Sequence, residues 1–255
     1  MQPTAPRSPP GHDFGQSDAH LCDPSRHNTL DAFADDRVRM IDDLDLWNIT
    51  LLGASMGAMI GVLASLQRPE RFQALVFIGA SPRCLNDQAY LGGFDRADID
   101  GFSHLIDHWQ NWQGAVTGMR LSRPVSLALQ EMAEQVQGVR PHVAGVVARS
   151  ISESDDRSLL PQVRHPVLVT QTKSDSAVPV SVTYYLTRQL PQAELVFMPG
   201  VGHLPNFMEP DVFNGVVRPF IHRWCAPEVP APRATDSLGM SPVDPHTRDE
   251  TSTRH

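Results

Sequence analysis

The chain is poor in lysine, in cysteine and in long apolar runs, and each shortage excludes a class of protein. Lys173 is the single lysine among 255 residues and the formal net charge is −8, so a nucleic-acid-binding surface is not expected. The three cysteines lie far apart, which excludes a disulfide framework or a zinc signature and favours a reducing cytoplasm. No apolar run reaches ~18 residues, so no contact with a membrane is expected.

The remaining composition is that of a globular protein with two polar ends. Hydrophobic residues make up 41% of the chain and charged residues 20%. Residues 1–14 are rich in proline, and residues 226–255 run through proline, serine, threonine, aspartate and arginine. Such segments bury too little surface to offset chain entropy, so both are expected to be disordered. Each is either a tail or a connection to another module, and residues 15–225 form one domain.

Between these ends, strand and helix signals alternate along the chain. Short apolar runs predict buried strands at residues 47–52, 74–78, 166–170 and 195–198. Helical spacing of apolar residues predicts helices at residues 29–46, 57–66, 180–190 and 211–224. This alternation predicts an α/β fold with a mostly parallel sheet.

Residues 86–160 interrupt the alternation. They have helical periodicity and no run typical of a strand. We expect a helical insertion that covers the carboxyl ends of the strands as a lid. Four aromatic side chains in it either line an apolar substrate pocket or simply pack the insertion: Phe94, Phe102, Trp109 and Trp112.

The sequence Gly53-Ala54-Ser55-Met56-Gly57 fits the pattern G-x-S-x-G. It follows a predicted buried strand and opens a helix of small residues, as a nucleophile elbow does. The flanking glycines permit a sharp turn that raises the Ser55 hydroxyl above the sheet, where the Met56 N–H faces a developing oxyanion. The alternative is an ordinary turn between strand and helix with a solvated serine.

A nucleophilic serine needs a base, and the base needs an acid that orients it. Asp175 follows the strand at 166–170, and His203 follows the last strand between glycines that leave the imidazole free to turn toward the serine. The chain order serine, aspartate, histidine is the order of the α/β-hydrolase triad. Asp175 could instead cap a helix, and His203 could be a histidine without chemistry. No metal or cofactor site is predicted.

The chain resembles the α/β-hydrolase family that holds the bacterial stress regulator RsbQ and the plant karrikin and strigolactone receptors. Its most specific stretch leads from a core strand into the lid and comprises residues 78–83 (IGASPR), 85–87 (LND), Tyr90 and 92–94 (GGF). Trp112, Asp175 and residues 202–205 (GHLP) also match, and the triad carried over is Ser55, Asp175 and His203. Ala54 departs from the family, which usually has histidine there.

The resemblance implies a lid of four helices over an apolar pocket, and slow hydrolysis of a small hydrophobic ester or lactone. In several members this hydrolysis is coupled to signalling, with a protein partner at the lid. The sequence also leads us to expect an N-terminally truncated fold without its first four strands. The second oxyanion donor would then be missing, and the strand at 49–52 would lack a neighbour.

Three hypotheses follow from these expectations. The chain is a serine hydrolase with a complete triad and one missing oxyanion donor, which is the hypothesis we favour. Alternatively, it is a non-catalytic module that senses a ligand or binds a partner. The third hypothesis is an inactive fragment of such a hydrolase.

Overall fold

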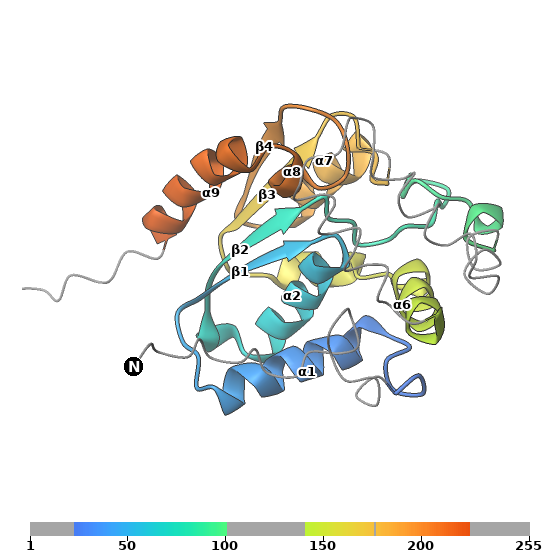
Figure 1. The fold of residues 1–255 in the computed structure, drawn as a ribbon, viewed down its shortest axis with the longest axis horizontal. Helices are drawn as coiled ribbons and strands as arrows, with labels where there is room; N and C mark the ends of the chain where they lie inside the picture. Colours follow the sequence, from blue (N-terminus) through green and yellow to red (C-terminus); the bar gives the residue numbers. More distant parts are fainter. Residues whose placement is uncertain (1–22, 101–140, 176, 225–255) are drawn as a thin grey trace, which may run out of the picture.

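The computed structural model describes residues 23–100, 141–175 and 177–224. Its centre is a parallel sheet with the strand order β1-β2-β3-β4 (Figure 1). The strands are β1 (Ile49–Ala54), β2 (Phe72–Ile78), β3 (Val167–Thr172) and β4 (Ala193–Met198). Each overlaps a strand expected from the sequence, so the predicted α/β fold with a parallel sheet is confirmed.

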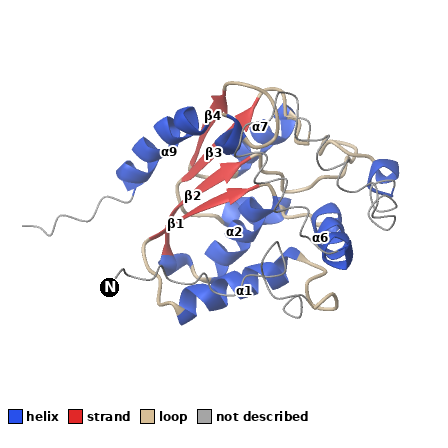
Figure 2. Ribbon diagram, in the orientation of Figure 1, coloured by secondary structure: helices blue, strands red, loops and turns tan. Residues whose placement is uncertain are grey.

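Helices cover both faces of this sheet (Figure 2). They are α1 (Leu30–Asp43), α2 (Met56–Gln67), α6 (Pro141–Glu153), α7 (Val180–Gln189), α8 (Pro205–Met208) and α9 (Pro210–Trp224). Side chains of α1, α2, α6 and α7 join one buried cluster, and α9 supplies a second cluster on the opposite face. The structure is therefore layered as helix, sheet, helix.

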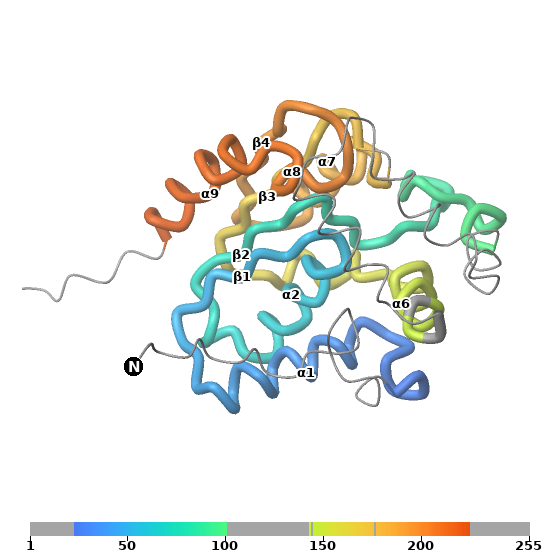
Figure 3. Tube along the Cα trace, in the orientation of Figure 1, coloured from blue at the N-terminus to red at the C-terminus, as the bar shows by residue number. Residues whose placement is uncertain are grey.

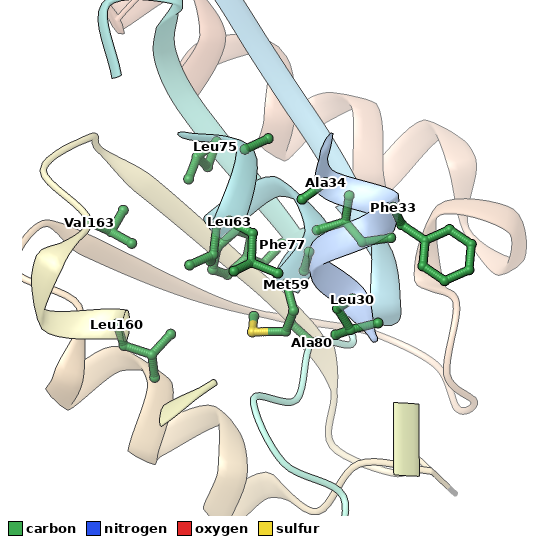
Figure 4. Close-up of a cluster of buried hydrophobic side chains, with 14 of the residues drawn as sticks. Leu30, Phe33, Ala34, Met59, Leu63, Leu75, Phe77, Ala80, Leu160 and Val163 are labelled. Carbon is green, nitrogen blue, oxygen red and sulfur yellow. The ribbon is translucent and has the colours of Figure 1, made fainter. Parts of the chain in front are cut away.

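The two buried clusters receive alternate side chains of the same strands. On β2, Leu75 and Phe77 belong to the larger cluster, whereas Ala74, Val76 and Ile78 belong to the cluster under α9. Successive side chains of a strand point to opposite faces, so an uninterrupted apolar run is what a strand covered on both faces requires. Figure 4 shows the larger cluster, where Leu75 and Phe77 lie among Met59, Leu63 and other apolar side chains.

The connection between β2 and β3 is the longest in the described chain (Figure 3). Its described parts contain α6 and the 3₁₀ helix η4 (Arg157–Gln162), and they add no strand to the sheet. Val143, Val147 and Leu160 are buried in the larger cluster, so this end of the insertion packs against the core. Residues 101–140 lie outside the described residues, and the lid as a whole stays a prediction.

The turn from β1 into α2 brings two backbones into direct contact. A Cβ at Gly53 would lie 2.5 Å from the Gly57 carbonyl oxygen, which is closer than real side chains approach. A Cβ at Gly57 would meet nothing within 4 Å. Only the first glycine of the motif is therefore required by packing.

Asp156, beside η4, is a buried acid without a compensating partner. Its side-chain Oδ2 has no hydrogen-bond partner in the described chain, and the residue is 9% exposed. Burial, and then the charges of Asp31 and Asp155, raise the pKa of Asp156 to about 6. Its neighbour Asp155 is different, because hydrogen bonds from Arg157 lower the pKa of that carboxyl.

We expect Gly53→Ala to lower the free energy of unfolding by about 3 kcal/mol, since the new methyl group overlaps backbone that cannot move aside. Gly57→Ala is the matched control. It should change stability by no more than about 1 kcal/mol, because the site is open and alanine favours a helix. Urea unfolding followed by circular dichroism measures both, and equal losses would contradict the close approach of strand and helix.

We expect Asp156→Asn to stabilise the protein at neutral pH. The pKa of Asp156 is higher in the folded protein than in the unfolded chain, so above pH 6 ionisation of the buried carboxyl lowers the free energy of unfolding. This loss of stability disappears as the pH falls toward 3.8, the pKa in the unfolded chain. The gain should be about 1–3 kcal/mol at neutral pH and should vanish near pH 4. Asp155→Asn should instead lower the stability at neutral pH. If thermal unfolding shows that both substitutions stabilise the protein, or that both destabilise it, this account is contradicted.

Candidate active site

Ser55 occupies the turn between β1 and α2 in a strained conformation. Its φ is 50° and its ψ is −120°, and its N–H donates to the Ile78 carbonyl at 2.8 Å. A non-glycine residue in such a region costs about 1–3 kcal/mol and persists only where its surroundings fix it. The close contact between Gly53 and Gly57 and the hydrogen bond to Ile78 hold Ser55 in this conformation. The serine is half-buried at the carboxyl end of the sheet, and its place between strand and helix is compatible with the predicted nucleophile elbow.

Asp175 lies in the loop after β3 with its side chain fully buried. Its Oδ1 accepts N–H groups of Ala177 at 2.8 Å and Val178 at 3.0 Å, so the loop backbone holds the carboxylate in place. The cap position of α7 is occupied by Pro179. The described hydrogen bonds of Asp175 therefore serve the loop and the histidine discussed next, and none of them caps the first turn of α7.

His203 follows β4 and contacts Asp175 directly. Its Nδ1 lies 2.9 Å from Asp175 Oδ2 and 3.1 Å from Oδ1, and the imidazole is 15% exposed. The backbone just before the histidine is held in place by hydrogen bonds. Gly202 is fixed on both sides, since its carbonyl accepts the Thr172 hydroxyl at 2.6 Å and its N–H donates to Ser174 at 2.9 Å.

Gly79, the residue directly after β2, lies against the same histidine. It has a φ of +56°, and a Cβ there would lie 2.7 Å from the His203 carbonyl oxygen and 2.9 Å from the ring. The sequence analysis assigned Gly79 no role. It could have done so, because Gly79 follows a predicted buried strand as Gly53 does, and a glycine in that place indicates a close backbone contact. Because Ser55 bonds to Ile78 and His203 packs on Gly79, the serine and the histidine flank one short piece of backbone.

The structure therefore gathers the three predicted residues at one end of the sheet. Asp175 and His203 are joined by hydrogen bonds, whereas no hydrogen bond joins Ser55 to His203 within the described residues. The second ring nitrogen, Nε2, likewise has no partner in the described chain. Catalytic hydrogen bonds are often looser in unliganded enzymes, so this arrangement is compatible with a base that engages the serine when substrate is bound.

Only one of the four predicted pocket residues lies in the described part of the chain. Phe94 is half-buried in the loop after β2, where its carbonyl accepts the Asn86 N–H at 2.8 Å and its N–H donates to Cys84 at 3.2 Å. Phe102, Trp109 and Trp112 lie outside the described residues. Met56 packs its side chain against the larger cluster, and its N–H belongs to the first turn of α2, whose N–H groups have no intrahelical acceptor.

Cys84 is the other group with nucleophilic chemistry near this loop. Burial raises the pKa of its thiol to about 11, so it stays protonated and weakly reactive at neutral pH. No cluster of three or more histidine, cysteine or acidic side chains suited to a metal ion occurs in the described ranges. No helix within them is long and apolar enough to cross a membrane.

Comparisons with known proteins agree with this geometry. Residues 13–210 match the family model of the alpha/beta hydrolase fold. The chain is similar to a probable esterase of Oryza sativa subsp. japonica, with 37% identity over 201 residues that cover 78% of this chain and 74% of the relative. It is also similar to the "Strigolactone esterase D14" of Arabidopsis thaliana, with 37% identity over 73% of this chain and 70% of the relative.

Solved structures give the same fold. A hydrolase from Oleispira antarctica superposes with a TM-score of 0.78 at 27% identity, over 82% of this chain and 78% of the other. The fold, the family model and the esterase relatives all indicate a hydrolase. The chain belongs to the α/β-hydrolase family, in the group that holds the strigolactone and karrikin receptors.

Proposed function

We propose that the protein is a serine hydrolase that cleaves a small hydrophobic ester or lactone, with Ser55, His203 and Asp175 as its triad. The observation that carries the proposal is the contact of His203 Nδ1 with the buried Asp175 carboxylate, at 2.9 Å, at the same end of the sheet as the strained Ser55. A carboxylate in this position fixes the tautomer of the imidazole and leaves Nε2 as the base.

The chemistry follows from these positions. His203 Nε2 takes the proton of the Ser55 hydroxyl as Oγ attacks the carbonyl carbon of the substrate. The carbonyl oxygen becomes an oxyanion, which the Met56 N–H and the positive end of α2 stabilise. The imidazolium then protonates the departing alkoxide, which in a lactone stays attached to the acyl chain. Water, activated by the same imidazole, releases the acid and restores Ser55.

The substrate class rests on the relatives and on the chemistry of the loops. One relative is named a strigolactone esterase, and the four aromatic side chains predicted for the pocket suit a small apolar molecule. A signalling partner that binds the insertion between β2 and β3 is part of the same proposal, because the group includes receptors.

A ligand-sensing module without turnover is the second candidate. It is favoured by the lack of a hydrogen bond between Ser55 and His203 among the described residues. In this case the ligand would bind without being cleaved.

A fluorophosphonate probe should label the wild-type chain at Ser55. Ser55→Ala should abolish labelling, because the probe reports a serine activated by its base. Ser65→Ala is the matched control, since Ser65 lies buried in the same helix with its hydroxyl bonded to the Val62 carbonyl. Labelling that survives in Ser55→Ala would remove this residue from the mechanism.

Hydrolysis of nitrophenyl acetate and of a simple apolar lactone tests the rest of the triad. Asp175→Asn should lower kcat by about 10⁴, because the amide favours the wrong tautomer of the imidazole. His203→Ala should lower kcat by a comparable factor. If the wild-type chain cleaves neither compound, yet a lactone raises its melting temperature, the protein is a sensing module and not a hydrolase.

A further inference from the structure

The loop of residues 84–94, which follows β2, is held in one shape by its own hydrogen bonds. Asn86 lies at their centre, because its N–H donates to the Phe94 carbonyl at 2.8 Å and its Oδ1 accepts the Gly93 N–H at 2.9 Å. The Phe94 N–H donates in turn to the Cys84 carbonyl at 3.2 Å. The beginning and the end of this loop are therefore bonded to each other, and Gly93 has a fixed place between them.

Two arginines and two aspartates anchor the 84–94 loop to the far end of the insertion. Arg157 contacts Asp155 through Nε at 2.7 Å and Asp87 through Nη1 at 2.8 Å. Arg83 contacts the same two carboxylates, at 3.0 Å for Asp155 and 3.7 Å for Asp87. The charges alternate in sign around a closed ring, and none of the four side chains is more than 36% exposed. Ion pairs that form such a network hold their partners more firmly than single surface pairs do.

Tyr90 connects this ring of charges to α7. The Arg157 guanidinium lies 4.9 Å from the centre of the Tyr90 ring, and the Tyr185 ring of α7 meets it edge-on at 5.0 Å. Tyr90 is buried, and its hydroxyl donates to the Arg83 carbonyl at 3.1 Å. The 84–94 loop is thus fixed against the end of the insertion on one side and against α7 on the other.

Gly93 is the residue through which the 84–94 loop meets the loop of Asp175. It has a φ of +116°, and a Cβ there would lie 2.9 Å from Pro179 Cδ and 3.3 Å from the Ala177 carbonyl oxygen. A proline ring cannot turn aside as a flexible side chain does, so this approach requires glycine. The backbone that Gly93 contacts also supplies the N–H groups of Ala177 and Val178, both of which donate to Asp175 Oδ1.

We propose that Gly93 is a positioning residue, which holds the Asp175 carboxylate against His203 by way of the backbone of residues 177–179. The oxygen that accepts the two N–H groups of this backbone, Oδ1, lies 3.1 Å from His203 Nδ1. A shift of residues 177–179 therefore moves the carboxylate relative to the imidazole. The consequence for turnover rests on the proposed hydrolase function, whereas the consequence for the hydrogen bond does not.

Proton NMR of the histidine ring N–H groups in the full chain tests the hydrogen bond without any need for turnover. The His203 Nδ1–H bonded to a carboxylate should give a low-field signal, which is assigned by its loss in His203→Ala. Gly93→Ala should move this signal to higher field or broaden it, because the new methyl group displaces Pro179 and lengthens the hydrogen bond. Val163→Ala is the matched control for lost stability. Val163 is fully buried but precedes β3, whereas Asp175 follows it, so the signal should stay in place.

An unchanged signal in folded Gly93→Ala, or an equal change in Val163→Ala, would overturn the proposal. Asn86→Ala is a second variant, which removes the acceptor of the Gly93 N–H and adds no atoms that could prevent folding. It should weaken the same signal, and a signal identical to that of the wild type would count equally against the proposal. Circular dichroism verifies that each variant is folded.

Hydrolysis of nitrophenyl acetate measures the consequence for turnover. Gly93→Ala should lower kcat by about 10² and change KM much less, since a displaced acid impairs the base and leaves substrate binding intact. Val163→Ala should keep the kcat of the wild type at a temperature where both are folded. A wild-type kcat in Gly93→Ala would overturn the role in turnover. A wild type that cleaves no ester would instead refute the proposed function, and the NMR signal would still decide whether Gly93 positions Asp175.

Discussion

The backbone of Gly53 lies against the backbone of Gly57, and the end of the sheet that holds Ser55, Asp175 and His203 is built on that contact. A Cβ at Gly53 would come within 2.5 Å of the Gly57 carbonyl, so the strand and the helix approach each other only because this residue is glycine. The backbone must then turn sharply at Ser55, which has a φ of 50°. The strain at the serine is therefore a consequence of how β1 packs on α2, and the hydrogen bond to Ile78 holds it there.

A parallel sheet brings the other two residues to the same place. Asp175 comes three residues after the end of β3, and His203 comes five residues after the end of β4. Because all four strands run in one direction, these loops meet at one edge of the sheet, beside Ser55. Buried polar contacts then fix the loops, since Thr172 of β3 binds the Gly202 carbonyl next to the histidine. The candidate site is thus held by elements that are rigid, although each of its three residues lies outside them.

The strand that precedes Ser55 differs from the other strands in its neighbours among the described residues. β2 and β3 have neighbours on both sides, and β4 is shielded by charge and aromatic cover. β1 has one neighbour within the described residues and an exposed Leu52. Because the position of Ser55 depends on β1, whatever covers this edge will also influence how firmly the elbow is held.

The sequence alone determined the elements and the order of the candidate triad residues along the chain. Apolar runs and helical spacing are local signals, so they placed four strands and four of the helices to within a few residues, and the glycines around Ser55 marked the elbow. The four-residue helix α8 (Pro205–Met208) was missed, because one turn is too short to have a period.

Contacts between distant residues were decided only by the tertiary structure. The orientation of His203 depends on Gly79, which follows β2, and on Thr172, the last residue of β3, and the burial of Asp156 depends on how η4 packs against the core. The exposure of Leu52 depends on the strand order. None of these can be read from a local pattern, because periodicity indicates which face of an element is apolar and does not indicate what lies against it.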